Sequence, residues 1–186
     1  MTDFELIAQL KLGNEMAFKT MVFQYQHKVF NTALGLVQHN NDAEDIAQEV
    51  FIQVYKSIQQ FRGDAALSTW IYRITVTKSL DFLRSKKRKK RVGIVLQLFQ
   101  HNKPVYEVPN FNHPGVVLDN KEKAALLFAC IQQLSENQKT AFVLNKIEDL
   151  SYAEIAAILK ISESAVDALL QRAKQNLRKL IDKKNK

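Results

Sequence analysis

Apolar residues in the first ninety positions recur at steps of three and four, which is the period of an amphipathic α-helix. One such stripe contains Phe18, Val22, Tyr25, Val29, Ala33 and Leu36. A second contains Ala43, Ile46, Val50, Val54 and Ile58, after the polar residues 40–42, which can cap a helix. Residues 61–64 interrupt the pattern, and Ser68 or Thr69 can cap a third helix that carries Trp70, Ile71 and Ile74. This part of the chain is therefore predicted to be a stack of amphipathic helices.

The helical period is lost between residues 92 and 120. All three prolines of the chain lie there, at positions 104, 109 and 114, although Leu96, Leu98 and Phe99 could form a short helical turn. We therefore predict an all-α fold of two small helical domains, residues 1–91 and 121–186, joined by an irregular linker at 92–120.

A helix-turn-helix pattern follows in the C-terminal part. Ser135 with Gln138 and Ser151 with Glu154 have the spacing of a capping box, which marks two helix starts. A third helix follows the short break at 160–162, and small Ala156 allows the two helices around that break to approach closely. The predicted buried face of the last helix is Val166, Leu169, Leu170, Ala173, Leu177 and Leu180.

The opposite face of the last helix is predicted to be exposed. It carries Glu163, Ser164, Asp167, Ala168, Gln171, Arg172 and Lys174, with Arg178 further along. A helix in the major groove reads base edges near its N-terminus and holds phosphates along its flanks. The pattern favours DNA binding, and an ordinary helical hairpin in a bundle is the alternative.

Charge is unevenly distributed in a chain whose net charge is +8. Seven of the eight residues from Arg84 to Arg91 are basic, and four of the 19 acidic residues lie between Asp42 and Glu49. Segregation of this kind favours two partners, one polyanionic and one cationic. The alternative is that each cluster is a solvated surface.

Several function classes are disfavoured by what the sequence lacks. The four histidines are scattered, and neither a Gly-rich phosphate loop nor a Cys/His metal spacing is present, so we expect no catalysis, metal or cofactor. Cys130, the single cysteine, lies in an apolar run and is expected to be a buried, inert thiol. With neither a signal peptide nor an 18-residue apolar run, the protein is expected to be cytoplasmic, without membrane insertion and without a required homo-oligomer.

Three segments, in order, resemble those of the extracytoplasmic-function sigma factors of bacterial RNA polymerase. Residues 42–51 resemble the polymerase-binding helix of that family. Residues 61–74, continued at 80–84, resemble its promoter-melting segment. Residues 134–138, 151–166 and 171–178 resemble its C-terminal domain. The resemblance implies a transcription initiation factor with no catalytic activity.

The resemblance also implies partners and site residues. Core RNA polymerase would be bound through its β′ coiled coil, with β as a further contact, by Asp42, Glu44, Asp45, Gln48, Glu49 and Phe51. The minus-ten promoter element, including a flipped base, would be bound by Arg62, Asp64, Trp70, Tyr72, Arg73, Lys78 and Arg84. The minus-thirty-five element would meet the exposed face of the last helix, and an anti-sigma factor is the expected regulator.

Some positions weaken or qualify this assignment. The spacing of Trp70 with Ile71 and Ile74 favours a core position, so Arg73, Lys78 and Arg84 are the favoured phosphate contacts. Lys160 stands where the family often has glycine, and Thr77 replaces a common asparagine. Asp167, Ala168 and Leu169 stand where many members have Lys, Ser and Arg, so the usual minus-thirty-five sequence cannot be assumed.

Two other functional classes fit parts of the chain. A response-regulator-like or repressor-type module, which acts without stable polymerase binding, would explain residues 121–186 but not segments 42–51 and 61–84. An anti-sigma protein or a purely structural bundle would explain the helices but predicts no promoter-dependent transcription.

Overall fold

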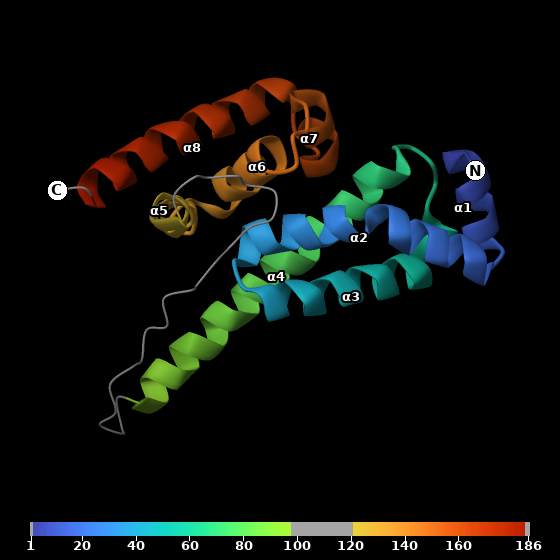
Figure 1. The fold of residues 1–186 in the computed structure, drawn as a ribbon, viewed down its shortest axis with the longest axis horizontal. Coiled ribbons are helices and arrows are strands. Elements are labelled where there is room, and N and C mark those ends of the chain that lie inside the picture. Colours follow the sequence, from blue (N-terminus) through green and yellow to red (C-terminus); the bar gives the residue numbers. More distant parts are fainter. Residues whose placement is uncertain (1, 98–120, 185–186) are drawn as a thin grey trace.

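A computed structural model of the chain describes residues 2–97 and 121–184, and every regular element in these ranges is helical (Figure 1). The N-terminal half contains α1 (Asp3–Lys11), α2 (Glu15–Val37), α3 (Asn40–Ser57), the short 3-10 helix η1 (Ile58–Gln60) and α4 (Leu67–Gln97). The C-terminal half contains α5 (Lys121–Ile131), α6 (Glu136–Lys146), α7 (Tyr152–Leu159) and α8 (Glu163–Lys184). The predicted all-α class is confirmed.

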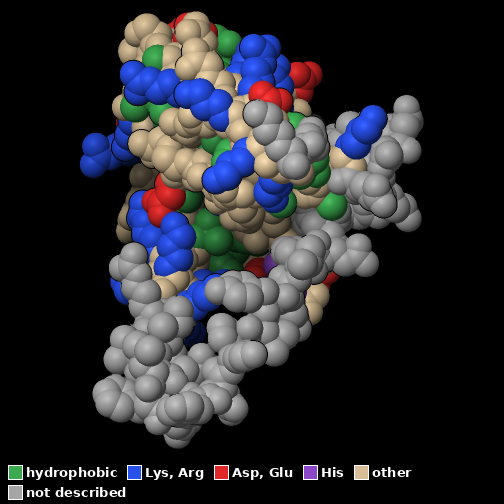
Figure 2. All heavy atoms as spheres, turned by 90° about the vertical axis from the view of Figure 1, so that its left-hand side faces the viewer, with side chains coloured by type: hydrophobic (Ala, Val, Ile, Leu, Met, Phe, Trp, Pro, Cys, Tyr) green, Lys and Arg blue, Asp and Glu red, His purple; other side chains and the backbone are tan. Residues whose placement is uncertain are grey.

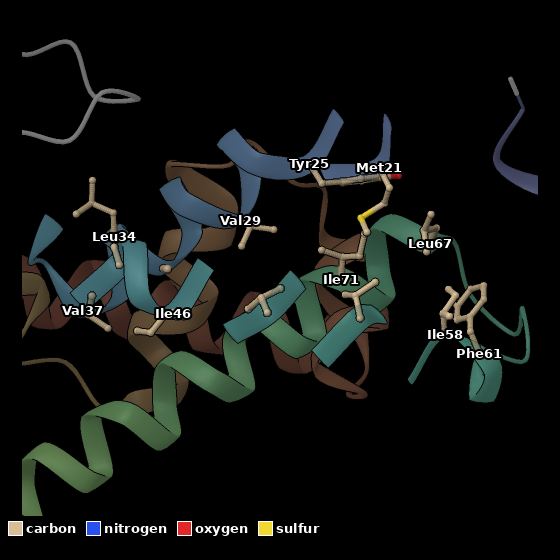
Figure 3. Packing of buried hydrophobic residues seen from close by; sticks show 14 of the residues in the cluster. Met21, Tyr25, Val29, Leu34, Val37, Ile46, Ile58, Phe61, Leu67 and Ile71 are labelled. Atoms are coloured by element: carbon tan, nitrogen blue, oxygen red, sulfur yellow. The ribbon is translucent and has the colours of Figure 1, made fainter. Parts of the chain in front are cut away.

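The core of the N-terminal half lies between α2, α3 and α4. All five residues of the predicted α3 stripe are buried, because a stripe repeated every 3.6 residues faces one side of the helix. Figure 3 shows Met21 of α2 directed toward Ile71 of α4 within this core. The predicted α2 stripe needs one correction, because Phe18 and Val22 are only half-buried and Ala17 and Met21 take the inner positions.

Two predicted helix starts differ from the observed ones. The cap of α3 is His39, whose Nδ1 accepts from the backbone N–H of Asp42, so the helix begins at Asn40. Helix α4 begins at Leu67, just before the predicted caps Ser68 and Thr69.

Of the two predicted capping boxes, one forms. Ser151 and Glu154 satisfy each other's backbone N–H at the start of α7. Ser135 does precede α6, but its side chain makes no cap bond. The carboxamide oxygen of Gln138 instead accepts from Asn176 of α8 at 3.0 Å. A tertiary contact has therefore replaced the predicted local one.

Helix α4 is longer than the sequence pattern predicts. It continues to Gln97, six residues past the predicted domain boundary at 91, and so includes Leu96. Lys and Arg are good helix formers, and the first proline does not come until position 104, so nothing local ends the helix within the basic run. The rest of the predicted linker, with Leu98 and Phe99, lies outside the described residues.

The two halves pack directly against each other, with α6 and α7 lying on α2 and α4 (Figure 1). Leu36 of α2 and Tyr72 and Val76 of α4 share one hydrophobic cluster with residues of α6, α7 and α8. Gly35 makes the approach of α2 to α6 possible, because a Cβ there would lie 2.8 Å from Cγ1 of Val143. Cys130 is buried, as predicted. None of the described helices is long and apolar enough to cross a membrane.

Candidate functional site

The outer face of α3 carries the predicted polymerase-binding residues. Glu44, Asp45, Gln48 and Glu49 are exposed, whereas Asp42 and Phe51 are half-buried. The carboxylate of Asp42 pairs with Lys86 at 2.8 Å, and that of Glu49 pairs with Lys78 at 3.3 Å. Glu44 and Asp45 are the two other carboxylates of this face and are exposed, so the surface can dock a basic partner.

An apolar continuation of the same face was not found by sequence reasoning. Ile52 and Tyr55 are 52% and 59% exposed, and they follow Asp45 and Gln48 at helical steps of three and four. The ring of Tyr55 is held by an edge-on contact with Phe18, with centroids 5.3 Å apart. An exposed, pre-positioned aromatic beside polar residues is typical of a protein-binding surface. The sequence did contain a signal for this surface, because Ile52 and Tyr55 lie outside the buried stripe of α3.

The loop between η1 and α4 forms a small hollow of about 160 Å³. Its lining comes from Gln60, Phe61, Arg62, Gly63, Asp64, Ala65, Trp70 and Arg73. Gly63 has φ +80°, a conformation that favours glycine, and α1 supports the loop because Lys11 donates to the carbonyl of Phe61 at 2.8 Å. Trp70 packs on Phe61 with centroids 5.0 Å apart. Trp70 is half-buried, so it belongs to the core and also lines the hollow.

A larger groove of about 780 Å³ runs between α3 and α4. Apolar side chains of Ile46, Ile74 and Phe82 line it, and so do the acidic Glu49 and Asp81. Its cationic lining residues are Arg73, Lys78, Arg88 and, from the helix-turn-helix, Lys160. The groove therefore combines four cationic side chains with two carboxylates, one of which, that of Glu49, is paired with Lys78.

The three favoured phosphate contacts of α4 are all engaged within the protein. The guanidinium of Arg73 donates to the carbonyls of Ala157 and Ile158 at the end of α7, with a shortest distance of 2.6 Å. Lys78 pairs with Glu49 across the groove. Arg84 pairs with Glu136 of α6 at 2.9 Å, which raises the pKa of Arg84 through that hydrogen bond and charge.

Tyr72, a predicted minus-ten residue, is only 5% exposed. Its hydroxyl donates to the carboxylate of Glu148 at 3.1 Å. Burial raises the pKa of Glu148 to about 7, an effect partly offset by the Tyr72 hydroxyl and the charge of Lys28. Burial and the neighbouring Glu148 also raise the pKa of Tyr72. In this arrangement Tyr72 is covered by the C-terminal half and does not face solvent.

The helix-turn-helix has a tight turn between α7 and α8. Lys160 ends α7 in the left-handed conformation at φ 56°, so this side chain occupies a position that glycine would fill at lower cost. Ser162 then accepts from the backbone N–H of Ala165 at the start of α8. Glu163 and Ser164, in the first turn of α8, are exposed beside this capped start.

Most of the predicted reading face of α8 is exposed. The exposed residues are Glu163, Ser164, Gln171, Arg172, Lys174 and Arg178. Asp167 and Ala168 are half-buried, and Gln171 donates to the carboxylate of Asp167 at 2.9 Å. Gln171 and Asp167, two residues of the predicted reading face, therefore lie side by side and restrict each other's orientation.

Basic side chains gather at the end of the molecule where α4 and α8 finish (Figure 2). Residues 86–90 of the basic run are exposed on α4. Two of these lysines have acidic neighbours, Lys86 with Asp42 and Lys87 with Glu136. In the described residues no group of three or more His, Cys, Asp and Glu side chains could hold a metal ion.

Family models match both halves of the chain. Residues 21–89 match sigma-70 region 2, and residues 124–177 match sigma-70 region 4. The two matches are in the order that the sequence motifs predict.

Curated relatives are similar along almost the whole length. The RNA polymerase sigma-H factor of Pseudomonas aeruginosa is 30% identical, over 96% of this chain and 93% of the relative. The ECF RNA polymerase sigma-E factor of Escherichia coli is 32% identical, over 94% of this chain and 92% of the relative.

Solved structures share the fold at lower sequence identity. CnrH in complex with the cytosolic domain of CnrY has a TM-score of 0.69, with 23% identity and 97% coverage of both chains. The sigma factor RpoE of Bartonella quintana, in complex with the anti-sigma factor NepR, has a TM-score of 0.66, with 19% identity. That match covers 89% of this chain and 96% of the other.

Proposed function

This chain belongs to the extracytoplasmic-function family of RNA polymerase sigma factors, and we propose that its polymerase and promoter contacts lie on three separate helical surfaces. As a member of that family it binds core RNA polymerase and directs promoter-specific transcription initiation, without catalysis of its own. What remains to be assigned is which surface meets which partner.

The polymerase surface is the outer face of α3. Asp45, with its acidic neighbours Glu44 and Glu49, meets basic residues of polymerase, and Ile52 and Tyr55 add apolar contact beside them. The observation that carries this assignment is the continuous exposed stripe from Asp45 to Tyr55 on one helix. Charge at such a surface steers and orients docking, while a buried aromatic anchor supplies affinity.

The promoter surfaces are the hollow and basic face of α4 and the exposed face of α8. The hollow at residues 60–65 has the polar lining and aromatic wall that suit an unstacked base. Helix α8 presents Gln171 and Asp167 to the major groove, with Lys174 and Arg178 for phosphates. On this basis residues 1–91 serve polymerase and the minus-ten element, residues 121–186 serve the minus-thirty-five element, and 92–120 connect them.

Regulation by an anti-sigma factor is part of the proposal. The solved relatives CnrH and RpoE are each bound to a second protein, the cytosolic domain of CnrY and the anti-sigma factor NepR. Action on polymerase and promoter DNA supports a cytoplasmic location as part of this proposal.

Reconstituted transcription with core polymerase and a randomised upstream element tests the division of surfaces. Asp167→Lys is expected to change the selected minus-thirty-five sequence, with each altered base contact worth about 1–3 kcal/mol. Lys174→Ala is expected to weaken all sequences alike. An unchanged selection with Asp167→Lys would remove α8 from the base-reading role.

A further inference from the structure

The start of the loop between η1 and α4 is held by the last residue of α1. The ammonium of Lys11 donates to the backbone carbonyl of Phe61 at 2.8 Å, and the backbone carbonyl of Lys11 accepts from the side-chain amide of Gln59. Gln59 and Phe61 lie on either side of Gln60, the first residue that lines the hollow. One residue of α1 therefore fixes the chain on both sides of the point where the hollow begins.

Helix α1 is itself fixed firmly enough to serve as an anchor. Its first turn is capped by the reciprocal hydrogen bonds of Thr2 and Glu5. Leu6 and Leu10 are 2% and 5% exposed, and they belong to the same hydrophobic cluster as Phe61. A hydrogen bond from a charged donor on such a helix is stronger than one between neutral groups, so the anchor resists displacement of the loop.

Beyond Phe61 the loop has few fixed points. Arg62, Gly63 and Asp64 are exposed, and the next buried residue is Leu67 at the start of α4. Exposed side chains of a short loop add little packing of their own to fix its path. The shape of the hollow therefore depends on where Phe61 and Leu67 hold the two ends of this segment.

The anchored residue also supports the aromatic wall of the hollow. The ring of Phe61 lies against that of Trp70, with centroids 5.0 Å apart and planes inclined at 41°. Lys11 does not line the hollow, so it acts on that wall only through Phe61. A pocket that is ordered before binding gives up less conformational freedom when an unstacked base enters, and it therefore binds that base more tightly.

We propose that Lys11 is a positioning residue for the hollow, whose shape it fixes for the flipped base of the minus-ten element without contacting DNA. This rests on the proposed assignment of the hollow to that element. It extends the promoter-binding apparatus to α1, a helix to which sequence reasoning gave no part. Loss of the Lys11 bond is expected to lower the affinity for the flipped base and not for the rest of the promoter, because contacts elsewhere do not pass through this residue.

The experiment measures binding of holoenzyme to a fluorescent single-stranded oligonucleotide that carries the minus-ten sequence of a promoter active in reconstituted transcription. Further oligonucleotides have an abasic site at each position in turn, and the loss of affinity at a position is its abasic penalty. The base in the hollow is identified as the position whose abasic penalty falls when the exposed lining residues Arg62 and Asp64 are both changed to Ala.

Lys11→Met keeps most of the apolar length of the side chain and removes its hydrogen bond. The abasic penalty at the identified position is expected to fall about tenfold, as for the loss of one charge-assisted hydrogen bond. Affinity for the abasic oligonucleotide and for core polymerase is expected to stay the same. Lys11→Arg can still donate to the carbonyl of Phe61 and is expected to retain the penalty. Lys19→Met changes an exposed lysine of α2 and is the control for the lost charge.

Three results would contradict this account, and they are distinguishable. An unchanged penalty in Lys11→Met would overturn the positioning role. Equal losses for intact and abasic oligonucleotides, shared by Lys11→Met and Lys19→Met, would overturn it too, because they would show a general effect of charge. If no position responds to the changes at Arg62 and Asp64, the assignment of the hollow to a flipped base fails instead, and with it the proposed function of this surface.

A second variant keeps the test decisive if Lys11→Met lowers the melting temperature. Gln59→Ala removes the other hydrogen bond to Lys11 from the loop side, without a change of charge. Its abasic penalty is expected to be about threefold lower than that of Gln24→Ala, which changes an exposed glutamine of α2. Equal penalties in these two variants would overturn the positioning role.

Discussion

The outer faces of α3 and α4 belong to adjacent helices of one bundle, yet they differ in what covers them. The exposed stripe of α3 from Asp45 to Tyr55 faces away from the C-terminal half. The face of α4 around Tyr72 and Arg73 lies under α6 and α7. Neighbouring surfaces on one rigid core can therefore differ in availability because a second group of helices packs on only one of them.

The largest expected effect comes from reversing charge on the α3 side of this comparison. Asp45→Lys with Glu49→Lys is expected to weaken binding to core polymerase about 100-fold at low salt, because like charges across an interface cost several kcal/mol. Both residues are exposed, so the fold and its melting temperature should be retained. Fluorescence titration with core enzyme measures the change, and Glu15→Lys with Asp182→Lys is the control. Unchanged binding would remove α3 from the polymerase contact.

Removing the basic run tests whether α4 contacts DNA phosphates. With Lys86, Lys87, Lys89 and Lys90 changed to Ala, promoter affinity of the holoenzyme is expected to fall equally on every sequence. Each lysine that no longer neutralises a phosphate should flatten the slope of log affinity against log salt by about 0.7–0.9. Binding measured over a salt series on two unrelated promoters checks this, with the exposed Lys19 and Lys56 changed to Ala as control. An effect confined to one promoter would contradict a phosphate role.

A smaller effect is expected from the apolar end of the α3 face. Tyr55→Ala should weaken core polymerase binding by about 1–2 kcal/mol, roughly tenfold, if the ring is a buried anchor in the complex. Phe4→Ala is the control, since Phe4 is an exposed aromatic on α1. Equal losses in the two variants would mean that Tyr55 has no special part in docking.

The smallest expected effect is a pH dependence of the packing of the C-terminal helices on α4. With the two halves packed together, which we call the closed form, the pKa of Glu148 is raised to about 7, so this form holds its proton more tightly than an open form with separated halves does. The contribution of this group to closing is complete below its ordinary pKa of 4.5 and is lost as the pH rises through about 7. The neighbouring titratable groups are Tyr72, Lys28 and, through Tyr72, Glu154.

Glu148→Gln separates this contribution from other titrations. Gln stays neutral and can still accept from Tyr72, so the variant is expected to remain equally closed from pH 6 to pH 8, while wild type loosens. Amide hydrogen exchange in α7 at the two pH values measures the difference. The same pH response in both proteins would show that another group is responsible.

The helices and the helix-turn-helix could be predicted from the sequence because their signals are local. The α3 stripe repeats with the helical period, and Ser151 and Glu154 are three residues apart. The closed arrangement could not be predicted in this way. Arg73 meets a carbonyl 84 residues away, and Tyr72 meets Glu148 at a separation of 76.

The other features that the sequence did not predict involve residue types that suit either a DNA contact or a contact between helices. Tyr and Arg each combine an apolar body with a polar end, so their type fits DNA and an interface between helices equally well. The role of Gly35 in the close approach of α2 to α6 could not be predicted either. A glycine within a helix gives no sequence signal of its own, and the need for it depends on Val143 of α6. Gln138 matched a capping box in sequence but is held by Asn176 of α8.

The packing of the two halves is tested most directly by the distance between them. Spin labels at Asn40→Cys at the start of α3 and Gln133→Cys just after α5 occupy exposed sites near the hydrogen bonds from Gln38 to Phe128 and from Gln132 to Leu36, and Cys130 is buried. Pulsed electron resonance on the free protein is expected to give one short distance. A long distance, or a broad spread of distances, would contradict the direct packing of the C-terminal helices on α2 and α4.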